Sequence, residues 1–376
     1  MKSKMGKTVC ARQHCTGCSV CADVCPCGAI EIFDHLDCTE AIINSTKCIA
    51  CNQCYFVCPN HRMVQQSESI EWRQGWSSSD KEREKSSSGG LAAEIAKAFV
   101  RDGGAVCSCV FNSGCFTFRM VDTQQELEEF RGSKYVKSNP KGCYREIKER
   151  ILSGQKVLFI GLPCQVAAVK NFVGSKLQDH LTTVDLICHG TPSVELLKRY
   201  MTQKGKEPSK VERLLFRKDN DFFLQVDGDA LDEGAQDHYT FAFLKSLTYT
   251  ENCYSCRYAT HLRVADITLG DSWGSSLDPE ELKKGVSLVL CQNAKGTTLL
   301  HKADVKLMDV DIERAIASNQ QLQHPARIPK RRKIFWKRIK SGKRLDTAVA
   351  LAYPYIYTKQ NVKRFLKRSF INGIRR

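Results

Sequence analysis

The sequence predicts an α+β protein of two domains: a small cysteine-rich unit, then an α/β domain with a mixed sheet, and finally a basic helical tail. Three observations support this prediction. A cysteine pattern occurs twice before residue 66, helical and strand patterns alternate over 88–325, and positive charge accumulates over 326–376. With 376 residues, the chain is long enough for two or three domains.

The cysteine-rich unit, residues 1–66, contains two copies of one motif. "CTGCSVCADVCP" begins at residue 15 and "CIACNQCYFVCP" begins at residue 48, an offset of 33 residues. The spacing C-x2-C-x2-C-x3-C-P is typical of bacterial ferredoxins with two 4Fe–4S clusters, in which the fourth cysteine of each motif ligates the other cluster. The unit has few large apolar side chains, so bound clusters would replace a hydrophobic core. Paired zinc knuckles are the alternative, but zinc favours cysteines in two pairs.

The spacing therefore predicts a dicluster ferredoxin with two crossed ligand sets. The first set is Cys15, Cys18, Cys21 and Cys58, and the second is Cys48, Cys51, Cys54 and Cys25. Eight other cysteines are interpreted as small buried hydrophobic residues, although the first two of them lie close to the motifs: Cys10, Cys27, Cys38, Cys107, Cys109, Cys115, Cys143 and Cys291.

The larger domain follows a polar stretch, residues 67–87, that predicts a linker. Beyond it, helical periodicity alternates with short apolar runs, which is typical of an α/β domain with a mixed sheet. Helices are predicted over 91–104, 123–132, 144–154 and 193–204, and strands over 105–111, 115–121, 156–161, 181–190, 211–218, 222–228, 265–271 and 286–292.

Four further cysteines lie in this domain at informative positions. Cys164 and Cys188 each follow a predicted strand, at the carboxyl end where open α/β sheets bind ligands, and "CYSC" adds Cys253 and Cys256. A third metal site and a set of buried thiols both remain open from spacing alone. No G-x-G-x-x-G follows a strand and no nucleophile elbow is present, so neither the usual dinucleotide fingerprint nor a serine hydrolase is indicated. "SSSGG" precedes a helix whose N-terminus could receive phosphate.

Six motifs in one order resemble the beta subunit of coenzyme F420 hydrogenase/dehydrogenase. They are "SSSGG", "RGSKYV", "GLPCQVAAVK", "DLICHGTPS", "CYSCRYA" and "RVADITLGDSWG", between Ser86 and Gly274. The resemblance implies a flavin-binding domain and a third 4Fe–4S cluster on Cys164, Cys188, Cys253 and Cys256. We expect FAD as the flavin, and FMN remains open from the sequence. It also implies flavin contacts at Ser88, Gly89, Gly90, Ser133, Lys134, Tyr135, Gly161, Pro163, Gln165 and Gly190. Lys134 could stabilise a reduced flavin and His189 could handle a proton.

The function expected from these features is an iron–sulfur flavoprotein oxidoreductase. Its clusters would carry single electrons to or from a flavin, which acts on coenzyme F420 or on a small molecule in a ferredoxin-dependent reaction. The alternative is an electron-transfer subunit that serves a separate catalytic partner and has no substrate site. A reductase of cell-surface polysaccharide or pigment synthesis is a third, weaker hypothesis that rests on analogy.

The C-terminal stretch, residues 326–376, carries seventeen Lys or Arg and one acid, Asp346, and so accounts for the whole net charge of +16. It predicts either a solvated tail or a docking segment for an acidic protein or an anionic membrane surface. No recognition motif accompanies the charge, so specific nucleic-acid binding is not expected. The N-terminus lacks a secretory h-region and no apolar run reaches the length of a membrane span, which favours a cytoplasmic protein.

Overall fold

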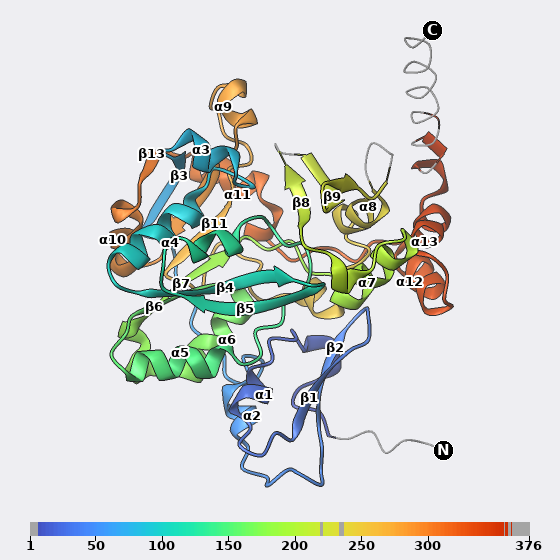
Figure 1. Ribbon diagram of the computed structural model, residues 1–376, viewed down its shortest axis with the longest axis horizontal. Helices are drawn as coiled ribbons and strands as arrows, with labels where there is room; N and C mark the ends of the chain where they lie inside the picture. Colours follow the sequence, from blue (N-terminus) through green and yellow to red (C-terminus); the bar gives the residue numbers. More distant parts are fainter. Residues whose placement is uncertain (1–6, 219–220, 233–236, 357, 360–361, 363–376) are drawn as a thin grey trace.

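The computed structural model describes residues 7–218, 221–232, 237–356, 358–359 and 362. Its N-terminal unit consists of two very short α-helices and one antiparallel hairpin (Figure 1). The elements are η1 (Arg12–His14), α1 (Val20–Val24), β1 (Ile30–Asp34), β2 (Thr39–Ile43) and α2 (Gln53–Val57).

The internal repeat of the sequence is also a repeat of the backbone. Gly17 and Ala50 have φ of +67° and +56°, and Ser19 and Asn52 have φ of +63° and +57°. Each pair is separated by the 33 residues that separate the two motifs. Left-handed conformations are unusual outside glycine, so three of these four residues adopt a costly conformation at equivalent places. Both motifs therefore curl in the same way before α1 and α2 begin.

The larger domain is built on an eight-stranded mixed sheet in the order β13-β3-β12-β11-β7-β6-β4-β5. The four central strands, β11, β7, β6 and β4, run parallel to one another. The other four, β13, β3, β12 and β5, are each antiparallel to the strands beside them. Their bounds are β3 (Glu71–Ser77), β4 (Ala105–Asn112), β5 (Cys115–Val121), β6 (Val157–Ile160), β7 (Leu181–Leu186), β11 (Ile267–Asp271), β12 (Ser287–Cys291) and β13 (Val305–Met308). The mixed α/β architecture predicted from the sequence is confirmed.

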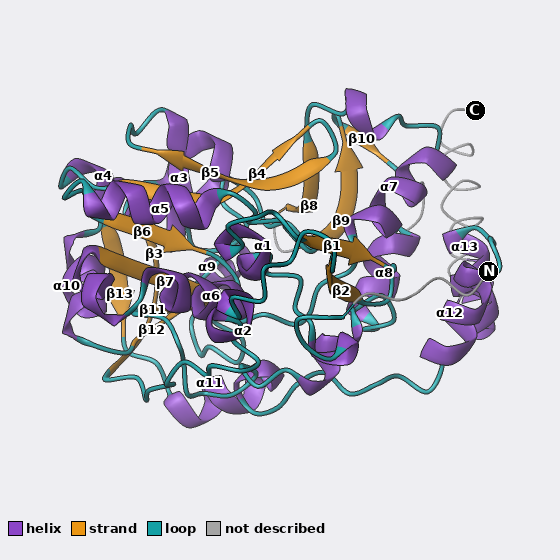
Figure 2. Ribbon diagram, turned by 90° about the horizontal axis from the view of Figure 1, so that it is seen from below, coloured by secondary structure: helices purple, strands orange, loops and turns teal. Residues whose placement is uncertain are grey.

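Helices cover both faces of this sheet (Figures 1 and 2). On one face α4 (Leu91–Arg101) and α10 (Ala294–Lys302) contribute Leu91, Ile95 and Leu300 to a core shared with the central strands. On the other face α5 (Cys143–Leu152) and α6 (Pro163–Val173) pack on β4 and β6. The helix predicted over 123–132 is instead a 3-10 segment, η2 (Glu126–Phe130).

The polar stretch 67–87 is not a linker, and that prediction was wrong. It forms β3, which pairs with β12 and β13 inside the sheet, and α3 (Asp80–Glu84). The inward polar residues of β3 find hydrogen-bond partners. Gln74 donates to the Asp309 carbonyl at 2.9 Å, and Ser77 Oγ donates to Glu94 at 2.8 Å. A strand whose buried side chains are polar but satisfied lacks the apolar pattern by which strands are recognised.

A second core lies beside the sheet. It gathers α7 (Val194–Gln203), α8 (His238–Leu244), β8 (Leu214–Lys218), β9 (Asp221–Val226), α12 (Arg332–Lys340) and α13 (Leu345–Ala352). Phe335 and Trp336 of α12 are buried there, and Trp336 Nε1 donates to the Leu247 carbonyl at 2.9 Å. Figure 2 shows α12 and α13 beside α8. The first half of the predicted tail therefore belongs to the folded body, and the expected boundary at 325/326 marks no break in packing. The rest of the chain from residue 363 lies outside the described residues.

The remaining elements of the described chain are short. They are η3 (Ser175–His180), η4 (Pro208–Lys210), β10 (Asp229–Ala230), η5 (Glu251–Ser255), α9 (Pro279–Lys283), α11 (Ile312–Ser318) and η6 (Gln320–Leu322). None of the helices within the described residues combines the length and apolar character needed to cross a bilayer.

The N-terminal unit is fixed to the larger domain by polar contacts. Both carboxylate oxygens of the buried Asp23, on α1, accept from the Gly142 backbone N–H at 2.8 Å, where α5 begins. A carboxylate at a helix N-terminus satisfies an otherwise unpaired donor and interacts favourably with the helix dipole. Arg145 Nε donates to the Asp23 carbonyl at 2.6 Å, and Tyr144 Oη donates to the Cys18 carbonyl at 2.8 Å.

Candidate metal centres and cofactor site

The first predicted ligand set lines a single pocket in the N-terminal unit. Cys15, Cys18, Cys21 and Cys58 all border it, although Cys58 is far from the others in sequence. Burial raises the pKa of Cys21, and the neighbouring Cys18, Cys15 and Cys58 thiols raise it further. Thiolates crowded in this way repel one another, and a bound iron cluster would supply the opposing charge. We call this set site I; its four thiols fit a 4Fe–4S cluster.

The second set, site II, consists of Cys25, Cys48, Cys51 and Cys54. Burial raises the pKa of Cys54, and Cys25, Cys48 and Cys51 add to the shift, so the four thiols are electrostatic neighbours. Cys48 and Cys51 are exposed, whereas Cys25 is buried. Site II is thus the outer of the two sites, and the crossed pairing of motifs is the arrangement that the structure brings together.

Two further thiols lie against these sites. Cys10 lines the site I pocket, and its hydrogen bonds lower the pKa of Cys15 and of Cys58 to about 6. Cys27 Sγ is 3.6 Å from Cys25 Sγ at site II. Both cysteines therefore lie next to predicted cluster ligands, which the interpretation as small buried hydrophobic residues does not include.

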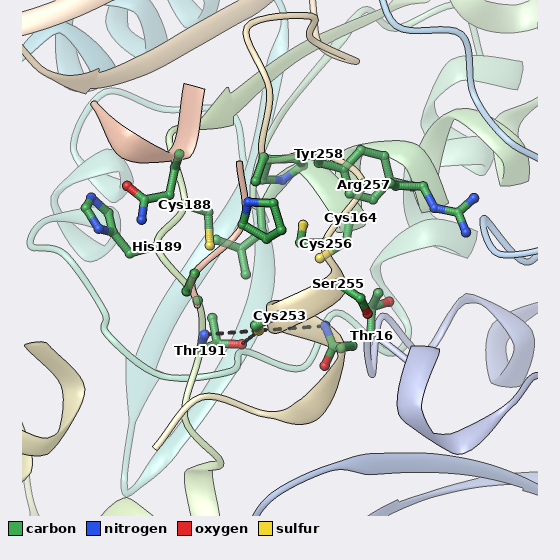
Figure 3. Close-up of a pocket in the computed structure, with 18 of the residues that line it drawn as sticks. Thr16, Cys164, Cys188, His189, Thr191, Cys253, Ser255, Cys256, Arg257 and Tyr258 are labelled. Atoms are coloured by element: carbon green, nitrogen blue, oxygen red, sulfur yellow. Dashed lines mark hydrogen bonds between the residues drawn. The ribbon is translucent and has the colours of Figure 1, made fainter. Parts of the chain in front are cut away.

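Site III gathers Cys164, Cys188, Cys253 and Cys256 around another pocket, which opens to solvent. Figure 3 shows their side chains converging from separate segments. Cys164 lies in the first turn of α6, after β6, and Cys188 follows β7, the parallel neighbour of β6. Cys253 lies in η5 and Cys256 directly follows it. Carboxyl ends of adjacent parallel strands meet at one edge of a sheet, which explains how distant residues come together.

The chemistry of site III also fits an iron–sulfur cluster. Burial raises the pKa of Cys164, with Lys137 opposing the shift and Cys256 and Cys188 adding to it. The Thr191 backbone N–H donates to Cys253 Sγ at 3.5 Å. Hydrogen bonds of this kind to cluster sulfurs tune reduction potentials. No group of three or more His, Cys, Asp or Glu within the described part of the chain is arranged to hold a single metal ion.

A buried ion pair holds two ligand-bearing segments of site III together. Arg263 Nη2 donates to Asp185 Oδ1 at 2.9 Å, and neither residue is more than 2% exposed. Asp185 lies on β7, three residues before Cys188. Arg263 also donates from Nη1 to the Tyr258 carbonyl at 2.8 Å, in the loop that follows Cys256. The pair therefore joins the end of β7 to the loop of the last two cysteines.

Lys137 lies between sites I and III. It is 8% exposed, and its Nζ donates to the Thr16 carbonyl at 2.8 Å and to Asn252 Oδ1 at 3.4 Å. Its charge acts to lower the pKa of Cys15 in site I and of Cys164 and Cys188 in site III. A buried cation placed in this way favours thiolates at both sites at once.

Sites I and III are immediate neighbours. Thr16 and Asn60 line both pockets, and the thiols of Cys18 and Cys164 interact electrostatically. Tyr144 and Tyr258 belong to the same apolar core as Cys18, Cys164 and Cys256. The structure thus places the N-terminal unit directly against site III.

The loops predicted to contact a flavin meet at the N-terminus of α4. The Ser133 backbone N–H donates to Ser87 Oγ at 2.9 Å, joining the "RGSKYV" loop to the "SSSGG" loop. Ser88 Oγ donates to the Val286 carbonyl at 3.2 Å, and the Gly89 N–H donates to Ser287 Oγ at 3.0 Å. Gly90 precedes the first turn of α4 with φ of +88° and no side-chain cap. An uncapped helix N-terminus fits a phosphate of a dinucleotide.

The side chains of Lys134 and Tyr135 contact other residues of this chain. Lys134 Nζ donates to the carbonyls of Phe130, Arg131 and Gly132 at 2.9–3.0 Å, and burial lowers its pKa. Its three donors are therefore used within its own loop. The Tyr135 ring stacks on Phe243 with centroids 4.8 Å apart.

Another group of predicted residues lies at site III. Pro163, His189 and Gly190 line the site III pocket. In Figure 3, His189 lies on the far side of Cys188 from Cys164 and Cys256. Desolvation lowers the pKa of His189, with Asp271 opposing the shift, which favours the neutral imidazole. Gly190 has φ of +135°, and a Cβ there would lie 2.4 Å from the Tyr249 ring, so only glycine fits.

Gln165 and Gly161 serve the backbone around Cys164. Gln165 Oε1 accepts from the Leu162 N–H at 2.9 Å, and its Nε2 donates to Ser138 Oγ at 3.1 Å. The Gly161 N–H donates to the Val184 carbonyl at 3.1 Å, which extends the β6–β7 pairing. Both residues fix the turn that presents Cys164.

Sequence reasoning missed Lys137, Thr16, Asn60 and the Asp185–Arg263 pair. The cysteine spacing marks ligands but carries no signal for the residues between two sites, because that position depends on how the N-terminal unit docks. Asp185 offered a partial signal, as a carboxylate in an otherwise apolar strand.

Comparisons with known proteins identify two families. Residues 154–312 match the family described as the carboxy-terminal part of the coenzyme F420 hydrogenase/dehydrogenase beta subunit, and residues 41–61 match the 4Fe-4S binding domain. One solved structure that is similar is a chain of the F420-reducing [NiFe] hydrogenase complex from Methanosarcina barkeri, in a xenon-derivatised form. It is 18% identical with a TM-score of 0.45, over 74% of this chain and 94% of that chain. A search of curated proteins gave no match.

The fold and the 4Fe–4S domain define an iron–sulfur protein with a large mixed α/β domain. Over residues 154–312 the chain matches the model of the coenzyme F420 hydrogenase/dehydrogenase beta subunit family, which confirms the resemblance seen in the sequence. The family and the iron–sulfur domain together indicate an oxidoreductase that transfers electrons.

Proposed function

We propose that this protein is an iron–sulfur flavoprotein oxidoreductase with three 4Fe–4S clusters, at sites I, II and III, and one flavin, FAD. The observation that carries the proposal is the gathering of Cys164, Cys188, Cys253 and Cys256 around one pocket that shares Thr16 and Asn60 with site I. When bound, the clusters would supply one-electron transfer, and the flavin would convert between single electrons and pairs.

The residues around the sites support electron transfer by position and charge. Tyr144 fixes the Cys18 backbone through its hydroxyl, and Asp23 fixes α1 against α5. These contacts hold site I at one place on site III instead of leaving it on a flexible tether. Lys137 would favour added negative charge at both sites, because a buried cation stabilises an anion more strongly than a solvated one.

The flavin would lie between the α4 N-terminus and site III. The backbone N–H groups of the first turn of α4 would donate to its phosphates, with Ser88, Gly89, Gly90 and Ser133 in the loops around them. His189 would hold or release a proton near the ring, and Gly190 would lie beside the flavin. Lys134 would act as a positive charge behind the phosphate loop, since carbonyls already use its donors.

Coenzyme F420, or a small molecule in a ferredoxin-dependent reaction, is the substrate class that this proposal favours. The support is the family match over residues 154–312. The rival function is an electron-transfer subunit that serves a separate catalytic chain. Substrate reduction by the isolated chain with a reduced donor would exclude that rival.

The Cys256→Ser variant tests the proposal at site III. We expect iron to fall by about four atoms per chain, one cluster's worth, while the signals of the N-terminal clusters persist in electron paramagnetic resonance. The matched control is Cys115→Ser, an exposed cysteine on β5 away from the three sites, which should keep all its iron. Unchanged iron in Cys256→Ser would remove the third cluster from the proposal.

A further inference from the structure

Site II lies beneath an exposed surface that carries several large apolar side chains. Phe56 is 63% exposed, Ile49 is 65% exposed and Met63 is 73% exposed, all within sixteen residues of Cys48. Tyr55 is also exposed, and its ring stacks on His61 with centroids 3.9 Å apart. This stacking holds the segment after Cys58 against α2, and the exposed apolar side chains all belong to residues 49–63, the stretch that carries Cys51 and Cys54.

The same surface is cationic. Residues 41–67 contain no Asp or Glu, whereas Lys47 and Arg62 are both exposed. We call Lys47, Ile49, Tyr55, Phe56, Arg62 and Met63 the outer face. An apolar centre with charges around it is typical of a surface that binds another protein.

The outer face coincides with the most accessible of the three metal sites. Cys48 and Cys51 are exposed, whereas all four thiols of site I are buried and those of site III are buried or half-buried. Electron transfer between proteins requires close approach of the redox centres, so a protein carrier would have to approach this end of the molecule. In Figure 1 the N-terminal unit forms the lower end of the molecule, and its α2 lies beside α6, where Asn171 Nδ2 donates to the Val57 carbonyl at 3.2 Å.

We propose that the outer face is the docking surface for a small acidic one-electron carrier protein. Lys47 and Arg62 favour an acidic partner. Residues 41–67 contain no acid with which they could pair, so both would pair with carboxylates at the rim of the partner. The same charge argues against a second copy of this chain docked through the same face, because the Lys47 and Arg62 side chains of the two copies would repel one another. The inference rests on the proposed function, since it assumes a cluster at site II.

In the step that the docking serves, the carrier loses one electron and the oxidised cluster at site II gains it. No bond forms or breaks between the two proteins. The contribution of the outer face is to hold the carrier close and to exclude water at the contact.

The experiment uses the full chain with its clusters and a fully reduced acidic flavodoxin as the probe, mixed anaerobically in a stopped-flow instrument. The outer-face variant is Lys47→Glu with Arg62→Glu, and Phe56→Ser tests the apolar part. The control is Lys333→Glu with Lys337→Glu, which makes the same charge change at exposed positions of α12. Dithionite, a small reductant that needs no docking surface, is used in parallel.

We expect the outer-face charge reversal to slow flavodoxin oxidation at least tenfold at low salt, with the α12 variant near the wild-type rate. Phe56→Ser should slow the reaction several-fold, and added salt should slow the wild type. Reduction by dithionite should be the same in all four proteins. Equal slowing by both charge reversals, or slowing by the α12 variant alone, would overturn the proposal.

Reduction by dithionite distinguishes a wrong docking surface from a wrong proposed function. If dithionite reduces the clusters of every variant but the outer-face variants react normally with flavodoxin, the docking surface lies elsewhere and the proposed function stands. If dithionite reduces no cluster in the wild type, the proposed function fails and the docking surface fails with it.

Discussion

Replacing Asp185 with alanine should destabilise the protein by about 3–5 kcal/mol and remove the cluster from site III. The reason is that Arg263 would remain buried without a counter-ion, and breaking a buried ion pair from one side costs about this amount. Thr268 Oγ1, which donates to Asp185 Oδ1 at 2.6 Å, would also lose its acceptor. The Tm, followed by circular dichroism, should fall by on the order of 5–10 °C.

Two control variants show whether the loss of stability comes from the unpaired buried charge. Asp102→Ala breaks an exposed ion pair with Lys302 and should cost less than about 1 kcal/mol. The double variant Asp185→Leu with Arg263→Met removes both charges and should recover much of the lost stability. It should not recover iron at site III, because the Tyr258 and Thr260 carbonyls would still lack the donors that hold the loop after Cys256. A single variant Asp185→Ala with wild-type Tm and iron would show that the pair does not hold site III together.

Paired cysteine variants in the N-terminal unit should show that the two motifs exchange their fourth ligands. Cys15→Ala with Cys58→Ala should lose one cluster and keep about eight irons per chain, because both residues belong to site I. Cys48→Ala with Cys58→Ala should lose two clusters and keep about four, although these residues share one motif. Iron and labile sulfide in anaerobically purified protein provide the measurement.

The opposite ranking would contradict the crossed assignment. If each motif held its own cluster, the pair Cys48 and Cys58 would be the one that keeps about eight irons. We do not expect that result, because Cys58 lies around one pocket with Cys15, Cys18 and Cys21. Each lost cluster should also lower the stability of the N-terminal unit, since cluster binding is coupled to folding where no apolar core replaces it.

The sequence predicted those parts of the structure whose signal is local. Cysteine spacing fixes how ligands are presented along a short loop, and apolar strands such as 157–160 and 287–291 are visible as runs. Cys164 and Cys188 could be placed at one sheet edge because each ends a strand, and parallel strands end together. That reasoning needed no knowledge of the strand order.

The rest depends on contacts between segments far apart in sequence. β3 escaped prediction because its buried Gln74 and Ser77 are polar and are satisfied by Asp309 and Glu94, which no local pattern shows. Lys137 escaped because its role follows from the docking of Thr16 against it. The charge of the stretch beyond 326 predicts a tail, yet Phe335 and Trp336 bury one face of α12 while its lysines are exposed.

The most direct test of the account is the amount of iron and flavin per chain in anaerobically purified protein. Three clusters of four predict about twelve irons, and the proposed binding loops predict one flavin. About twelve irons with one flavin would establish the full set of centres. About eight irons without flavin would contradict the account, leaving a ferredoxin unit attached to an α/β domain that holds no redox centre of its own.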